Sequence, residues 1–149
     1  ALAGGPRAAR AEAFLESAQE VPAIINGSFG FARLAIRANR IRYRLKIGEL
    51  QGNVTFAHIH IGQKGVNGGV SVFLCDTTGN PAAAGAPACP QQGVVTGTLD
   101  ASDVLGPAGQ GVAAGDLDGL QQAILSNLAY VNVHSDAFPA GEIRGQLHR

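Results

Sequence analysis

The chain of 149 residues has no Met and no Trp, only two Cys and two Tyr, and a charged fraction of 15%. Without Met a blue-copper centre lacks its usual axial ligand, and two Cys, if bonded to each other, leave no thiolate for such a centre or for a cysteine-rich zinc site. A formal net charge of +0 and few aromatic residues are not typical of a nucleic-acid binder. The sequence contains no run of the ~18 apolar residues that a transmembrane helix needs. We therefore expect no nucleic-acid partner and no membrane span.

Glycine and proline are frequent, with 21 Gly and 7 Pro. They separate short segments in which apolar and polar residues alternate, as in half-buried β-strands. We predict strands over residues 13–18, 28–36, 40–47, 54–61, 69–75, 94–99, 128–134 and 141–147. A helix should begin after Asp116, with an apolar stripe of Leu117, Leu120, Ile124 and Leu128. The predicted fold is all-β, an antiparallel Greek-key-like sandwich or barrel of about eight strands with one short helix.

These strands place residues 13–149 in a single β domain, preceded by a flexible segment over residues 1–12. Cys75 and Cys89 bracket a run of small residues, and a disulfide between them would stabilise the fold by ~3 kcal/mol. The alternative is two unpaired buried thiols. A disulfide predicts a secreted, periplasmic or cell-surface protein, and the Ala-rich start agrees with prior removal of a signal peptide.

Positive charge is concentrated in one part of the sequence. Six of the eleven Lys and Arg residues lie between residues 33 and 46, whereas acidic residues dominate the second half. Three explanations stay open: solvated cations that meet acids of the second half, binding of an anionic polysaccharide or extracellular protein, and contact between subunits of a homo-oligomer. Alternation places four of the cations on one face of a single strand: Arg40, Arg42, Arg44 and Lys46.

Three histidines occupy strand positions that favour metal binding. His58 and His60 alternate in an apolar strand, so both imidazoles leave the same face, and His134 ends a second strand. Ligands held by two strands form a rigid site. Three imidazoles with an open fourth position suit copper or zinc, and a carboxylate such as Glu142 or Glu20 would extend the set to Fe, Mn or Ni.

Residues near His134 are candidates for further ligands or for supporting roles. Tyr130 and Asn132 share its face of the strand, and Glu142 lies in the closing strand. The alternative is that the three histidines are neutral and satisfy buried hydrogen bonds with Asn132, Tyr130 or Glu142. The fourth histidine, His148, is expected to be exposed near the chain end.

Three stretches of the sequence together resemble the CHRD domain, a module repeated in chordin and found alone in many bacterial secreted proteins. They are EVP at residues 20–22 after FLESAQ, the central AHIHIGQKGVNGGVSVFLC, and the closing YVNVHSDAFPAGEIRGQL. The resemblance extends from about Phe14 to Leu147. It implies an all-β fold and an extracellular setting, and it says less about activity.

The strand that carries His58 and His60 is also similar, more faintly, to the copper-binding strand of Cu,Zn superoxide dismutases. No histidine lies between residues 61 and 133, so the bridging and zinc-site histidines of that family have no counterpart. This similarity therefore implies at most a mononuclear site. If the protein is an enzyme, we expect a metal-dependent oxidoreductase.

The closing motif places Glu142, Arg144 and Gln146 on one face of a strand. Arg144 is expected to pair with Glu20 and so to join the first and last strands, a structural role. The alternative is that Glu142 or Arg144 orients His134 or a ligand. Two functions remain open: an extracellular domain that binds a single metal through the three histidines, and a metal-free matrix module that binds through its basic strand.

Overall fold

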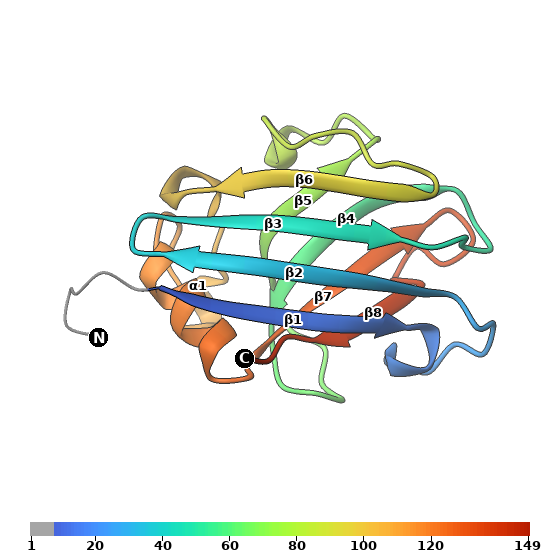
Figure 1. Ribbon diagram of the computed structural model, residues 1–149, viewed down its shortest axis with the longest axis horizontal. Coiled ribbons are helices and arrows are strands. Elements are labelled where there is room, and N and C mark those ends of the chain that lie inside the picture. The colour runs from blue at the N-terminus through green and yellow to red at the C-terminus, as the bar shows by residue number, and fades with distance from the viewer. Residues whose placement is uncertain (1–7) are drawn as a thin grey trace.

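The computed structural model describes residues 8–149, and in them eight antiparallel strands form one sheet accompanied by one α-helix (Figure 1). The elements in chain order are β1 (Ala9–Glu16), β2 (Phe29–Arg37), β3 (Arg40–Ile47), β4 (Val54–Ile61), β5 (Val70–Asp76), β6 (Gly93–Leu99), α1 (Leu117–Leu125), β7 (Ala129–Ser135) and β8 (Ile143–Gln146). Hydrogen-bonded neighbours follow the order β5-β4-β7-β8-β1-β2-β3-β6. The sheet curls into a nearly closed barrel, which confirms the predicted all-β class.

Alternation along the strands separates a buried inner face from an outer face. On β3, for example, every second residue is buried in the core while the cations between them are exposed. α1 lies at one end of the barrel, where Leu120 and Ile124 are fully buried (Figure 1). Asp116 caps this helix as predicted, because its carboxylate accepts a hydrogen bond from the Gly119 N–H at 2.8 Å.

The open side of the barrel lies between β5 and β6, the two outer strands of the sheet. Residues 77–92 connect these strands, and the predicted disulfide between Cys75 and Cys89 ties the connection back to β5. The Tyr43 hydroxyl on β3 donates a hydrogen bond to the Leu74 carbonyl on β5 at 2.6 Å. Covalent and side-chain links therefore hold the side that strand pairing leaves open.

The first strand is longer at its start than the sequence predicts. β1 begins at Ala9, which pairs with Ile36 of β2, so residues 9–12 belong to the sheet and not to a flexible segment. Residues 1–7 lie outside the described residues. Ala11 and Ala13 are buried, but their small side chains give a weak apolar alternation that concealed this part of the strand.

Two other predicted boundaries are wrong. α1 ends at Leu125, so Leu128 lies beyond its apolar stripe and is 45% exposed. The reason is local, since Asn127 has a φ of 60°, which turns the chain out of the helix before β7. The last strand begins at Ile143, so Glu142 precedes it in a bend.

Candidate functional site

The three predicted histidines converge on the outer face of the barrel. His58 and His60 lie on β4 and His134 lies on the adjacent β7, and the intervening residues, such as Ile59 and Val133, point into the core. One ring nitrogen from each histidine can be chosen so that all three lie within 4.8 Å of one another. The structure therefore brings together the residues that the sequence predicts as ligands.

Aromatic rings surround this outer site and bury it. Phe56 packs against His58 and His134, with ring centroids 4.9 and 4.5 Å away, and the centroid of Phe73 lies 4.3 Å from that of His58. Tyr130 stacks on His60 at 4.7 Å with an interplanar angle of 2°. Each histidine is consequently at most 8% exposed, although none faces the barrel core.

Backbone carbonyls fix the orientation of two of the imidazoles. The Nδ1 of His60 lies 2.9 Å from the Gly68 carbonyl, and the Nδ1 of His134 lies 2.7 Å from the Pro139 carbonyl. A carbonyl only accepts, so both Nδ1 atoms carry the proton and both Nε2 atoms present a lone pair. Such outer hydrogen bonds commonly orient histidines that ligate metals.

The free lone pairs meet at Asn132. Its Oδ1 lies 2.8 Å from the Nε2 of His60 and 3.1 Å from the Nε2 of His134. His58 approaches through Nδ1, 3.2 Å from the Nε2 of His134, and its own Nε2 is buried without a hydrogen-bond partner among the described residues. Facing lone pairs repel one another unless a cation lies between them or the Asn132 amide turns to donate its NH₂ protons.

All three imidazoles are held in the neutral form that metal binding requires. Burial lowers the pKa of His58 to about 3, with the neighbouring histidines adding to the effect. Burial likewise lowers the pKa of His134 to about 4, against the opposing effect of its hydrogen bond to Pro139. Burial also lowers the pKa of His60. No proton therefore has to leave these rings before an ion binds at neutral pH.

We expect the rings of His58 and His134 to stay neutral when the metal-free protein is taken from neutral pH to about pH 5, whereas an ordinary histidine protonates near ~6.5. Because their folded pKa values lie below the unfolded value, the stability they contribute is complete above about pH 6.5 and is lost as the pH falls towards the folded values. Imidazole chemical shifts measured by NMR across this range provide the test. A midpoint near ~6.5 for either ring would contradict the expectation.

Arg144 anchors the loop that supports His60. Its guanidinium is almost fully buried and lies 3.5 Å over the centre of the Tyr130 ring. It donates three hydrogen bonds to the loop, to the carbonyls of Val66 at 2.7 Å and Gln63 at 3.2 Å and to Asn67 Oδ1 at 3.1 Å. The same loop supplies the Gly68 carbonyl. Arg144, Tyr130 and His60 thus form a stack across three adjacent strands, β8, β7 and β4.

The ion pair predicted between Arg144 and Glu20 is not formed, because no direct contact within 4.0 Å joins them in the described chain. The guanidinium is instead engaged by Tyr130 and by the loop carbonyls. Burial raises the pKa of Glu20 to about 7, and the charge of Arg144 opposes that rise from a distance. The charge of Arg144 therefore acts on the pKa of Glu20 although the two side chains are not in contact.

Glu142 does not join the histidines, which corrects its prediction as a ligand. Its carboxylate accepts hydrogen bonds from the backbone N–H of Gln51 at 2.6 Å and from the hydroxyls of Ser135 at 2.6 Å and Ser28 at 2.9 Å. Burial would raise its pKa, but these bonds outweigh burial and hold the pKa below its usual value. Gly141 has a φ of 126° and Glu142 lies in a bend, so Glu142 does not share a strand face with Arg144.

The remaining predicted residues lie away from the histidines, and some groups that support the histidines were not predicted. The basic residues of β3 lie on the outer face of the barrel, away from β4 and β7, and His148 is exposed. The role of Phe56 was detectable, because it alternates with His58 and His60 on β4. The carbonyls of Gly68 and Pro139 come from loops, and side-chain patterns do not predict them.

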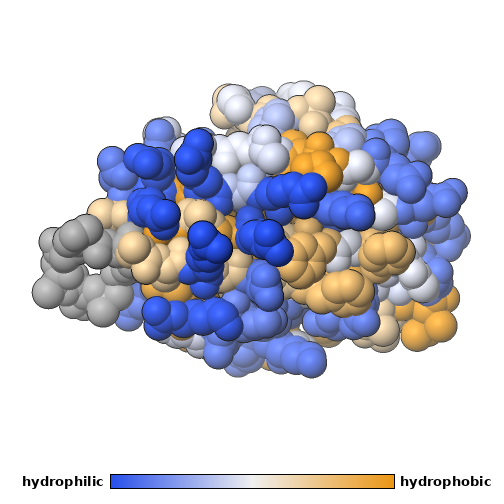
Figure 2. Space-filling model, in the orientation of Figure 1, coloured by the Kyte–Doolittle hydropathy of each residue, from blue (hydrophilic) through white to orange (hydrophobic). Residues whose placement is uncertain are grey.

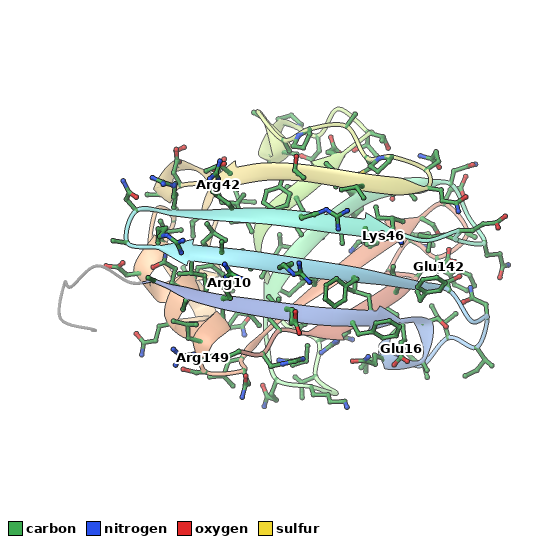
Figure 3. The ribbon with its side chains drawn as sticks, viewed as in Figure 1. Arg10, Glu16, Arg42, Lys46, Glu142 and Arg149 are labelled. Carbon is green, nitrogen blue, oxygen red and sulfur yellow. A yellow bond between two sulfur atoms is a disulfide. The ribbon has the colours of Figure 1, made fainter. Side chains whose placement is uncertain are left out.

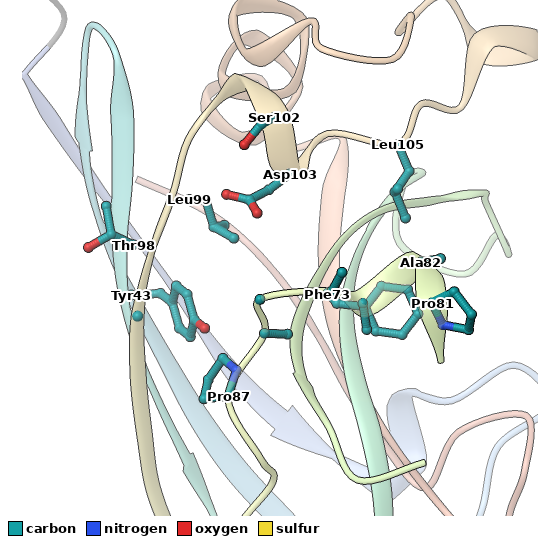
Figure 4. Close-up of a pocket in the computed structure, with 15 residues that line it drawn as sticks. Tyr43, Phe73, Pro81, Ala82, Pro87, Thr98, Leu99, Ser102, Asp103 and Leu105 are labelled. Atoms are coloured by element: carbon teal, nitrogen blue, oxygen red, sulfur yellow. The ribbon is translucent and has the colours of Figure 1, made fainter. Parts of the chain in front are cut away.

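The molecule also has a cavity of about 280 Å³ on its open side, lined in part by Tyr43, Phe73 and Asp103 (Figure 4). The residues described as lining it include no histidine. Its polar groups already serve the fold, since the Tyr43 hydroxyl bonds to Leu74 and the Asp103 carboxylate accepts from the Asp100 N–H at 2.8 Å. The chemistry of the protein is therefore better sought at the histidines.

Comparison with known proteins points to one family. A family model described as the CHRD domain matches residues 11–147 of the chain. No curated protein and no solved structure matches, so the faint similarity to superoxide dismutases has no support from a relative. No described helix is long and apolar enough to cross a membrane. The family match and the disulfide are both consistent with an extracellular setting.

Proposed function

The chain belongs to the CHRD domain family, and we propose that it is an extracellular β-domain that binds one transition-metal ion through His58, His60 and His134. The observation that carries this proposal is the convergence of lone pairs. Two Nε2 atoms and the Asn132 Oδ1 face one another, and the Nδ1 of His58 lies 3.2 Å from the Nε2 of His134. A buried lone pair that faces neither a proton nor a cation costs about 1–3 kcal/mol, and an ion bound among these nitrogens would remove that cost.

The donor set favours copper or zinc. Neutral imidazoles suit both ions, and a set of three leaves a position open for a further ligand. Asn132 lies within reach as an oxygen donor or as a hydrogen-bonding support. With copper, the site would supply one-electron redox chemistry, so any enzymatic activity is expected to be that of a metal-dependent oxidoreductase. With zinc, the ion would hold β4 and β7 together or act as a Lewis acid.

The opposing explanation is a metal-free hydrogen-bonded cluster. If the Asn132 amide turned to donate to both Nε2 atoms, His60 and His134 would be satisfied without an ion. Among the described residues the buried Nε2 of His58 has no partner in this arrangement, and it would gain none from an ion held at Nδ1, so it does not decide between the two. We favour the metal-bound arrangement because one nitrogen from each of three neutral imidazoles lies within 4.8 Å of the others.

Metal loading tests the proposal. Protein purified without an affinity tag and treated with a chelator should bind one Cu(II) or Zn(II) per chain after loading and desalting, as measured by elemental analysis. With Cu(II), the electron paramagnetic resonance spectrum should show coupling to imidazole nitrogens. Protein that retains neither ion after loading would exclude the proposed site.

A further inference from the structure

Seven cations of the first half of the chain form one continuous surface, which we call the basic face. Its residues are exposed and lie on the outer face of β1, β2 and β3 (Figures 2 and 3). They comprise seven of the eleven Lys and Arg residues of the sequence: Arg10, Arg33, Arg37, Arg40, Arg42, Arg44 and Lys46.

The protein itself does not neutralise this face. Within the described chain the one ion pair is Arg33–Glu12, with a distance of 4.0 Å. The expectation that acids of the second half meet the basic strand is therefore wrong. The strand of the second half that borders β3 is β6, and it places Thr98 opposite Arg42 and Thr96 opposite Arg44.

Pairing within the sheet increases the repulsion. Arg33 on β2 lies directly opposite Arg44 on β3, and Arg37 lies opposite Arg40. Like charges in directly opposed positions destabilise a sheet. An external anion would relieve this repulsion, whereas folding alone does not.

Aromatic rings share the face with the cations. Phe31 lies opposite Lys46, and the Arg33 guanidinium lies 5.6 Å over the Phe31 ring. Phe14 and Phe29 stack with centroids 6.4 Å apart, and each is about half exposed. The face therefore offers flat apolar rings next to a row of positive charges (Figure 2).

We infer that the basic face binds an acidic polysaccharide laid along the strands. Alternate residues on a strand are about 6.8 Å apart, so β3 presents a regular row of cations to an extended polyanion. Sugar rings can pack on Phe14, Phe29 and Phe31, while sulfate or carboxylate groups pair with the arginines. The disulfide and the family match favour an extracellular polymer over a nucleic acid.

Binding to dextran sulfate, to alginate and to neutral dextran tests the inference and separates sulfated from carboxylated ligands. The protein should bind at least one of the two acidic polymers and not neutral dextran, and binding should be lost at about 1 M salt, where the Debye length is ~3 Å. Arg44→Gln should weaken binding up to about five-fold and Arg42→Gln/Arg44→Gln about ten-fold. The matched control is Lys64→Gln, which removes an exposed cation from the loop between β4 and β5.

The arginine variants should fold as well as the parent, because they remove like-charge repulsion, and an unchanged or raised Tm verifies this. Full polymer binding by the folded double variant would overturn the inference, as would equal loss in Lys64→Gln. Tighter binding to anionic vesicles or to single-stranded DNA than to either acidic polymer would assign the face to another partner and also overturn it. The inference is independent of the metal, so a His58→Ala variant should bind the polymer normally.

Discussion

Replacement of His134 by alanine is expected to reduce bound metal from one ion per chain to none after desalting. His134 is the only histidine ligand proposed on β7, and its Nε2 lies 3.2 Å from the Nδ1 of His58 and 3.1 Å from Asn132 Oδ1. Without it, the remaining imidazole ligands come from β4 alone, and two nitrogens are too few to hold the ion through desalting. Loss of a residue that merely supports a ligand costs about 10–100-fold in affinity, and loss of the ligand itself should cost more.

His148→Ala is the matched control for this prediction. It makes the same chemical change at an exposed histidine outside the cluster, and it should leave one ion per chain. Metal content by elemental analysis and affinity by competition with a chelator measure both variants. Equal metal in the two variants would contradict the assigned ligand set, provided that circular dichroism shows both to be folded.

Arg144→Ala is expected to lower the free energy of unfolding by about 3 kcal/mol or more. The substitution removes the contact with Tyr130 and three charge-assisted hydrogen bonds to the loop that carries Gln63, Val66 and Asn67. The three histidines remain, so metal should still bind. Its affinity should fall about ten-fold, because the loop also carries the carbonyl that orients His60.

Denaturant unfolding of the metal-free protein and chelator competition measure these two effects separately. Arg144→Lys should recover the charge but not the forked hydrogen bonds, and its stability should fall between those of the parent and Arg144→Ala. Arg149→Ala removes an exposed arginine and should have little effect. A loss of stability in Arg144→Ala with no change in metal affinity would restrict Arg144 to a structural role.

The period-two pattern of the sequence predicted the parts of the molecule that regular strands determine. It placed His58 and His60 on one face of β4, and the structure adds the pairing that brings His134 beside them. It also placed the cations of β3 together on an exposed face. The disulfide between Cys75 and Cys89 followed from a run of small residues between the two cysteines.

Features that depend on bends and loops could not be predicted in this way. Glu142 precedes β8 in a bend, so alternation assigned it to the wrong face. The pair between Arg144 and Glu20 was inferred from charge, but the loop carbonyls and Tyr130 take the guanidinium instead. Nothing in a side-chain pattern indicates which carbonyl will orient a histidine.

The histidines lie on the outer face of β4 and β7, so metal binding and core packing use opposite faces of the same strands. Residues such as Ile59 and Val133 maintain the barrel from one side, and His58, His60 and His134 act on the other. A substitution at a donor position therefore opens its void among the outer rings and leaves the barrel core filled. The donors can be exchanged, by design or by evolution, to change ion preference or to abandon the ion while the scaffold stays intact.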